Sequence, residues 1–499
     1  MQKEMQTYEE LNSQIQKLAQ QLKAVLLENE QFKAVLAENE RLKAVLAENE
    51  QLKTVLAQNE QLKAEIAALK EKVNTNSSNS SKPPSQDPNR EPRKKEPTGK
   101  KRGGQPGHSR NMRQLTPPED VTEMFEIKPE ACPSCGENAF DDQPVRTEIR
   151  QVTELPEIKP DVYQYNIHTC RCGRCGKHVK AKVPQEAIGA FGPRLMGFMA
   201  ILSAEFHVPK RKVVNLLGYL NIRISLGTVC KTQALAGEIL EGPYETIRQF
   251  TLNQPHVNGD ETSWKIQGKR CWLWIATTPK SVFFSIDPSR STEAFRRIYG
   301  NDFDKLLTTD RYSAYNDHEG ERQLCLGHID RDFEKIEGRG DFDQTVGEHL
   351  KKEIDGVFKC WHSYKDGTIS HAEMRDLIES QHLAAFKVIF EIGSIAANVT
   401  SKTQNTCDNL LKDFSKMWTF LKHEGVEPTN NLAERDIRHG VLWRKISFGN
   451  QSESGKIFVQ RMLTIVMTLK KQAQNSLNYL VKCFQAHKTG QEIPHPQLL

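Results

Sequence analysis

Three acidic residues lie in segments whose predicted structures could bring carboxylate groups together. The apolar and aromatic segment HVNGDETSWKI predicts a strand that carries Asp260, and KLLTTDRYSAYN predicts a strand that ends at Asp310. The segment NNLAERDIRHG predicts a helix with Asn430 or Asn431 as its cap and Glu434 in its first turns. Two strand carboxylates and one helix carboxylate can converge on one pair of metal ions.

The chemistry that such carboxylates perform is phosphoryl transfer on DNA. Two Mg²⁺ ions roughly 3.5–4 Å apart activate a water or a 3′-hydroxyl, stabilise the leaving oxygen and neutralise negative charge. Asp and Glu supply the oxygen ligands that such hard ions prefer. Each carboxylate taken singly is more often an ordinary surface acid, so the hypothesis depends on the three segments together. The chain has no Gly-rich phosphate loop and no serine nucleophile elbow as a competing site.

A β-meander is predicted to position the first carboxylate. After the strand of Asp260 come a turn at QGKR and two apolar segments, CWLWIATT and SVFFSI. Because side chains alternate along a strand, we expect Glu261 to point to the face opposite Asp260.

Two matching cysteine pairs predict a zinc module. Cys132-Pro-Ser-Cys135 and Cys172-Gly-Arg-Cys175 are separated by 36 residues, and a glycine follows each second cysteine. Tetrahedral zinc takes four such thiolates, and segments such as VYQYNIH predict strands between the pairs, as in a zinc ribbon. The alternative is four reduced core thiols, and Cys170 could replace Cys172 as a ligand. A closed four-cysteine site is structural, so we expect the module to present a surface to DNA.

The periodicity becomes helical between about residues 192 and 240. PRLMGFMAILSAEF and KRKVVNLLGYL predict two helices, and Ser225 is a suitable N-cap for a third. Two short helices joined by a tight turn fit a DNA-binding helix-turn-helix, although such helix pairs are also common without DNA. The residues predicted to contact DNA are Lys210, Arg211, Lys212, Thr228 and Lys231.

An internal repeat near the N-terminus predicts a coiled coil. Between about residues 8 and 73 a ten-residue unit recurs with Asn29, Asn39, Asn49 and Asn59 in register. A ten-residue period is a heptad plus three, which overwinds a left-handed coil and places the asparagines in its seam. We expect this segment to associate with other copies; the alternative is a single solvated helix.

Composition and charge narrow the class of protein. Lys plus Arg exceeds Asp plus Glu by 69 − 64 = 5. The stretch from Arg90 to Arg113 contains nine basic residues and only two glutamates. This basic run is either a solvated tail or an arm that follows DNA phosphates. The N-terminus lacks an apolar signal, and no stretch approaches the roughly 18 apolar residues of a membrane span. We therefore expect a soluble, cytoplasmic protein whose clustered cysteines bind metal.

Four segments resemble the core motifs of the insertion sequence 66 family of bacterial DDE transposases. They are HVNGDETSW, TTDRYSAY, CLGHIDRDF and PTNNLAERDIRHGVLWRKISFGNQSESG. The linker and the paired cysteines also match that family, so the resemblance covers roughly residues 70–485. It implies that Asp260, Asp310 and Glu434 are the metal-binding triad of an RNase H-like fold. The 124-residue step from Asp310 to Glu434 implies a helical insertion.

The resemblance also concerns residues around the triad. It implies that Cys325 and His328 lie near the active site, with a packed strand end and a satisfied histidine as the equal alternative. The cations near Glu434 are expected to hold DNA phosphates or else to form a solvated helix face. These cations are Arg435, Arg438, Arg444 and Lys445. His439 stands where the family usually has proline.

Together these expectations describe a multidomain chain with an α/β RNase H-like catalytic domain. The expected parts are a coiled-coil oligomerisation helix (1–73), a disordered basic linker (74–118), a zinc-binding module (119–185), a helical, helix-turn-helix-like DNA-binding segment (186–250), the catalytic domain (251–450) with an all-helical insertion at about 340–425, and a C-terminal helix and tail (451–499).

The expected function is a DNA transposase that uses Mg²⁺ or Mn²⁺ to cleave transposon ends and join them to target DNA, with Zn²⁺ in the module. The expected partners are terminal inverted repeats, target DNA, further copies of the chain and accessory transposition proteins, in a nucleoid-associated complex. One rival is a domesticated DNA-binding protein without catalysis, which an intact triad disfavours. The second rival is a nuclease that hydrolyses without joining, which the metal site alone does not exclude.

Overall fold

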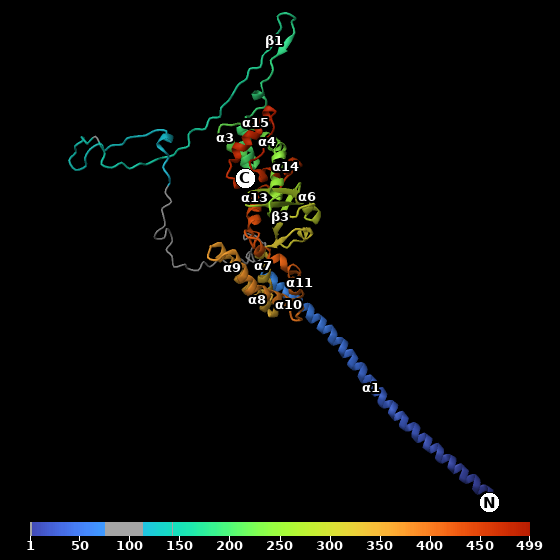
Figure 1. Cartoon of the computed structure of the whole chain (residues 1–499). Coiled ribbons are helices and arrows are strands. Elements are labelled where there is room, and N and C mark those ends of the chain that lie inside the picture. Colours follow the sequence, from blue (N-terminus) through green and yellow to red (C-terminus); the bar gives the residue numbers. More distant parts are fainter. Residues whose placement is uncertain (1, 75–112, 142) are drawn as a thin grey trace. The chain divides into compact units, whose positions relative to one another are not determined.

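The computed structural model describes residues 2–74, 113–141 and 143–499 (Figure 1). Most of the linker predicted over residues 74–118 therefore lies outside the described residues. None of the described helices is both long enough and apolar enough to cross a membrane.

The chain divides into two compact units, each built from two separate stretches. The first unit combines Met1–Arg90 with Leu306–Asn430, and the second combines Glu91–Lys305 with Asn431–Leu499. The three acids of the predicted triad are divided between them, because Asp310 belongs to the first unit.

The second unit contains the predicted β-meander. Three strands pair antiparallel in sequence order: β3 (His256–Ile266), β4 (Lys269–Thr277) and β5 (Val282–Asp287). The register places Asp260 opposite Ile275. The β3–β4 turn has positive φ at both Gln267 (50°) and Gly268 (76°), as a type I′ hairpin turn requires. The meander expected from the apolar pattern is confirmed.

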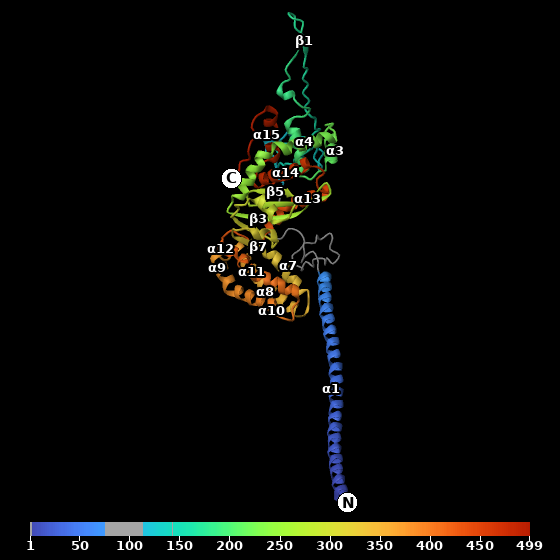
Figure 2. The same ribbon diagram turned by 90° about the vertical axis from the view of Figure 1, so that its right-hand side faces the viewer.

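Two C-terminal helices pack on this meander (Figure 2). They are α13 (Asn431–Ser447) and α14 (Glu453–Lys471). Leu273 and Phe284 of the strands share a buried apolar cluster with Ile437 and Leu463 of the two helices. Other helices of this unit are α2 (Pro193–Ala204), α3 (Lys210–Tyr219), α4 (Leu226–Ile239), α5 (Glu241–Leu252), α6 (Thr292–Tyr299) and α15 (Ser476–Thr489).

The first unit contains two parallel strands followed by helices. The strands are β6 (Leu306–Thr309) and β7 (Arg322–Leu324). The helices are α7 (Leu326–Glu337), α8 (Asp341–Lys365), α9 (His371–Ile378), the π-helical turn η5 (Glu379–Leu383), α10 (Ala384–Ile395), α11 (Ser401–Lys412) and α12 (Thr419–Lys422). Their core is rich in buried aromatic rings, including Phe333, Phe386, Phe390 and Phe420. The segment expected at about 340–425 is helical, and its being an insertion in an RNase H-like domain stays a prediction.

The N-terminal repeat forms one long helix, α1 (Gln2–Asn74). Its apolar residues are exposed in a single copy, with Leu36 at 61%. Each ten-residue unit adds an ion pair such as Glu30–Lys33, at 3.2 Å, whose solvated charges contribute little stability. The helix is therefore confirmed, and its pairing into a coiled coil stays a prediction.

The region around the cysteine pairs differs from expectation. No strand covers VYQYNIH (162–168); the next strand begins directly after it, at Thr169, and Tyr163 is 77% exposed. The short hairpin of β1 (Thr169–Arg171) and β2 (His178–Lys180) encloses the second pair instead. The prediction was wrong because a strand needs a hydrogen-bonded partner as well as a suitable residue pattern.

Candidate active site and nucleic-acid interface

Asp310 lies directly after β6, where several groups fix its position. The Tyr312 backbone N–H donates to Asp310 Oδ1 at 2.9 Å. The guanidinium of Arg322 on β7 donates to the Asp310 carbonyl oxygen at 2.6 Å and to Thr309 Oγ1 at 2.9 Å. Arg322 is only 4% exposed, so a buried cation orients the turn that carries Asp310. Nothing in the sequence pattern marks Arg322 for this role.

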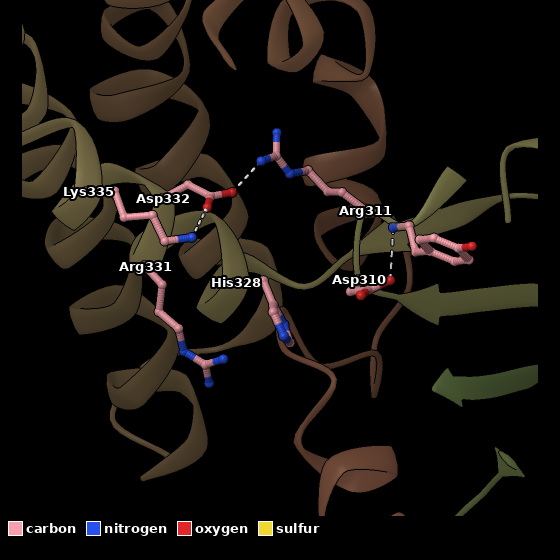
Figure 3. A pocket seen from close by; sticks show the side chains of 7 residues that line it. Asp310, Arg311, His328, Arg331, Asp332 and Lys335 are labelled. Atoms are coloured by element: carbon pink, nitrogen blue, oxygen red, sulfur yellow. Dashed lines mark hydrogen bonds and ion pairs between the residues drawn. The ribbon is translucent and has the colours of Figure 1, made fainter. Parts of the chain in front are cut away.

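A cavity of about 190 Å³ lies beside Asp310 (Figure 3). It is lined by Asp310, Arg311, Tyr312, His328, Arg331, Asp332 and Lys335. Asp332 forms ion pairs with Arg311 and, at 2.9 Å, with Lys335, and so holds two cations in the lining. Within the described part of the chain, no cation pairs with the Asp310 carboxylate. The cavity thus combines a carboxylate that can bind metal with cations suited to phosphate.

Cys325 and His328 lie at the start of α7 and differ in their surroundings. Cys325 is 1% exposed; its N–H donates to the Thr309 carbonyl oxygen at 2.8 Å, and its Sγ accepts the Asn430 N–H at 3.1 Å. The first bond joins the end of β6 to the start of α7, and the second joins Asn430 to Cys325, so Cys325 is packed at a strand end; a role in the active site stays a prediction. His328 instead lines the cavity together with Asp310.

Asp260 and Glu261 are neighbours on β3 with different environments. The Asp260 carboxylate accepts the Glu261 N–H at 2.8 Å. The Glu261 side chain is fully buried and forms an ion pair with Arg290, whose Nε lies 2.7 Å from Oε1. The Arg290 guanidinium also lies over the Trp272 ring, 4.7 Å from its centroid. Glu261 is therefore committed to a structural contact with Arg290.

Glu434 lies in the first turn of α13, and a buried polar group fixes this helix on the meander. Asp436 Oδ2 accepts hydrogen bonds from Lys471 Nζ and from Thr277 Oγ1, each at 2.6 Å. Burial lowers the pKa of the Lys471 ammonium, although the Asp436 charge opposes this effect. The network joins α13, α14 and the end of β4, so the start of α13 has a defined position.

The four cations predicted near Glu434 are not equivalent. Arg444 is half-buried and donates to Ser263 Oγ at 2.6 Å, and burial lowers the pKa of its guanidinium. Its hydrogen bonds fasten α13 to β3. Arg435, Arg438 and Lys445 are exposed, and in the described chain no acidic side chain pairs with them. These three are the cations of α13 that remain available to DNA phosphates.

The helices expected in the DNA-binding segment are α2, α3 and α4. Ser225 caps α4 as predicted, because its Oγ accepts the Thr228 N–H at 3.1 Å. Every residue predicted to contact DNA is exposed or half-exposed: Lys210, Arg211, Lys212, Thr228 and Lys231. The cap and the helices are confirmed, and contact with DNA stays a prediction.

The two cysteine pairs form turns of the same geometry. In each turn the first cysteine N–H donates to the carbonyl oxygen five residues later at 2.7 Å, and the glycine four residues later donates back at 2.9 Å. Gly136 and Gly176 both have positive φ, 76° and 73°, which glycine adopts without strain. The second turn begins at Cys172, whereas Cys170 lies on β1 outside it. Cys172 therefore occupies the same position in the second turn as Cys132 in the first.

Both turns favour thiolates at their first cysteine. Backbone N–H groups, that of Ser134 first, lower the pKa of Cys132, and those of Cys175 and Arg174 lower the pKa of Cys172. Zinc binds the thiolate form, so each pair is suited to ligate the metal. Among the residues that the structure describes, the two pairs are not gathered into one four-sulfur group.

Comparison with known proteins gives matches along most of the chain. A family model described as "Transposase IS66 family" matches residues 189–456, more than half of the chain. A model described as "zinc-finger binding domain of transposase IS66" matches residues 129–176, which include both cysteine pairs. A model described as a "Family of unknown function" matches residues 1–114.

A curated relative matches part of the chain. The uncharacterized protein y4qI of Sinorhizobium fredii (strain NBRC 101917 / NGR234) is 25% identical over 280 residues. The match covers 50% of this chain and 49% of that protein, so this chain spans about half the length of the relative.

Proposed function

This chain belongs to the IS66 transposase family, and we propose that it cuts DNA at transposon ends and joins the freed 3′-hydroxyl to target DNA. Asp260, Asp310 and Glu434 are the proposed metal-binding triad of an RNase H-like catalytic domain. The observation that carries the proposal is the setting of Asp310. In the described chain its carboxylate has no cationic partner, although cations line the cavity beside it.

The residues present fit a divalent metal. Tyr312 N–H occupies Asp310 Oδ1, which leaves the other carboxylate oxygen for an ion. Asp260 on β3 would supply a second carboxylate, and Glu261 beside it is held by Arg290. Mg²⁺ or Mn²⁺ bound by these oxygens would supply nucleophile activation and neutralise charge on the scissile phosphate.

The protein's own part in the reaction is positioning and charge. Arg322 holds the Asp310 turn, and the Asp436–Lys471 pair holds the start of α13. Arg331 and Lys335 in the cavity are placed to bind a phosphate beside Asp310. Such fixed charges lower the barrier because they need no rearrangement when the phosphate reacts.

The remaining parts of the chain are proposed to bind DNA and to assemble the complex. The paired cysteine turns would hold Zn²⁺, whose binding contributes on the order of 10–16 kcal/mol to folding such modules. Helices α3 and α4 would bind the transposon end, and α1 would join copies of the chain through a coiled coil. Accessory transposition proteins are further proposed partners.

The proposal is tested with the Glu434→Gln variant, which removes one ligand charge at nearly constant size. We expect full binding of transposon-end DNA in Ca²⁺ and loss of cleavage in Mg²⁺, measured by fluorescence anisotropy and by gel. Glu453→Gln is the matched control, because Glu453 is an exposed acid at the start of α14. Undiminished cleavage by Glu434→Gln would exclude Glu434 from the metal site.

Two rivals have distinct outcomes in the same experiment. A domesticated DNA-binding protein would bind the ends without any metal-dependent cleavage by the wild-type chain. A nuclease would cleave them without joining the 3′-hydroxyl to a target.

A further inference from the structure

The solvent-facing side of α13 alternates cations with apolar residues. After Asn431 its exposed residues are Arg435, Arg438, Leu442, Lys445 and Ile446; each is three or four positions from another of them, so they lie along one face of the helix. We call these five residues, together with Phe448 just beyond the helix, the α13 outer face. From Arg435 to Phe448 it extends about 20 Å, at 1.5 Å per helical residue.

Phe448 is presented to solvent on an unusual backbone. Its side chain is 78% exposed, and its φ is 58°, a region that bulky residues rarely adopt. The Phe448 N–H donates to the Arg444 carbonyl oxygen at 2.8 Å, which fixes the residue to the last turn of α13. The ring thus projects from a defined position.

The residues after Phe448 fasten its turn to β3. Gly449 has φ 99°, and a Cβ there would overlap the Lys265 carbonyl group. Asn450 exchanges backbone hydrogen bonds with Lys265 and Gln267, each at 2.8 Å, and its Oδ1 accepts from Trp264 Nε1 at 2.7 Å. A turn held by these hydrogen bonds keeps the Phe448 ring in place. Because the ring is exposed, its position is not explained by burial in the hydrophobic core.

The charges of the same face suit a nucleic-acid strand. Arg435, Arg438 and Lys445 have no acidic partner among the described residues, so they are available to phosphates. Such cations also bind the phosphates of duplex DNA, but the bases of a duplex are stacked on one another and offer no open face to an aromatic ring. Unpaired nucleotides use cations for the backbone and aromatic rings for the bases, which is the combination found here.

We infer that the α13 outer face binds an unpaired segment of DNA strand, with Phe448 stacked on a base and the cations on its phosphates. The inference rests on the proposed function, since α13 also carries Glu434. It assigns to this helix a ligand class, unpaired deoxynucleotides, and to Phe448 a role as the stacking residue. About 20 Å of helix matches roughly six nucleotides at a stacked spacing of 3.4 Å.

The test measures binding by the full chain in the absence of divalent metal. Two probes are used: an oligothymidylate of about ten nucleotides with a central 2-aminopurine, and a duplex of about 20 base pairs. Stacking quenches 2-aminopurine fluorescence. We expect Phe448→Ala to abolish the quenching and to weaken single-strand binding about 10-fold. We expect duplex binding to change less than about twofold, because the cations remain.

Two further variants serve as a rescue and as a control. Phe448→Trp should restore quenching, because an indole stacks at least as well as a phenyl ring. Ile395→Ala removes an equally exposed apolar side chain from α10, and it should alter neither the quenching nor the binding of either probe.

Three results with Phe448→Ala would overturn the inference. The variant could still quench the probe, or it could lose duplex binding as strongly as single-strand binding. It could also lose self-association in sedimentation while quenching stays unchanged. The last would assign Phe448 to a protein contact. The proposed function fails separately, if the wild-type chain quenches the probe but does not cleave transposon ends in Mg²⁺.

Discussion

Replacement of Arg322 by methionine tests how Asp310 is positioned. Arg322 donates to the Asp310 carbonyl oxygen at 2.6 Å, to Asn316 Oδ1 at 2.8 Å and to Thr309 Oγ1 at 2.9 Å while only 4% exposed. Hydrogen bonds of charged groups contribute about 1.5–3 kcal/mol each, and buried acceptors left unsatisfied cost about 1–3 kcal/mol.

These contributions are not additive, and methionine also removes the cost of burying a charge. We therefore expect the free energy of unfolding to fall by about 3–5 kcal/mol, a large fraction of the roughly 5–15 kcal/mol of an ordinary domain. Where the chain still folds, a displaced Asp310 is expected to lower the cleavage rate about 100-fold, since a shift of 1 Å has this effect.

The assay combines urea unfolding with single-turnover cleavage of transposon-end DNA. Arg322→Lys should fall between the wild type and Arg322→Met, because an ammonium can reach some but not all of the three acceptors. Arg375→Met is the control for loss of an exposed arginine. If Arg322→Met unfolds and cleaves as the wild type does, the buried guanidinium does not position Asp310.

Three further predictions concern other parts of the chain. Gly449→Ala should lower the free energy of unfolding by about 2–4 kcal/mol in urea titrations, because φ of 99° and a nearby carbonyl group exclude a Cβ; unchanged stability would refute the close approach. Burial lowers the pKa of both His207 and His439, so below about pH 6.5 the unfolded chain binds more protons and stability falls with falling pH. His439→Gln should reduce the loss of stability between pH 7.5 and 5.5, measured by thermal unfolding. A pH profile identical to that of the wild type would show that His439 does not contribute to the loss. Cys172→Ser should abolish zinc binding measured by elemental analysis while Cys170→Ser retains it, and the reverse result would exchange the two ligands.

Regular local patterns predicted much of the fold. Apolar and aromatic segments predicted the β3–β5 meander, and Ser225 predicted the start of α4 through its capping hydrogen bond. The two Cys-x-x-Cys turns followed from their spacing, since a tight turn depends on residues adjacent in sequence. The family resemblance, through the 124-residue step from Asp310 to Glu434, implied that the stretch containing α8 is helical.

Contacts between distant residues could not be predicted. Nothing local distinguishes the buried Arg322 from an exposed arginine, because its partners come from β6 and the turn after it. The pairing of Glu261 with Arg290, 29 residues later, likewise depends on the fold. The strand expected over VYQYNIH failed for the same reason, since a pattern does not supply a partner strand.

Strand transfer in vitro tests the proposed transposase activity and its metal-binding triad together. Purified protein is incubated with Mg²⁺ or Mn²⁺, labelled transposon-end DNA and a supercoiled target, beside the Asp260→Ala variant. We expect a joined product from the wild-type chain and none from Asp260→Ala, with end binding unchanged. If the protein binds native ends without metal-dependent cleavage, it is not an active transposase; if joining survives Asp260→Ala, Asp260 is not a metal ligand of the reaction.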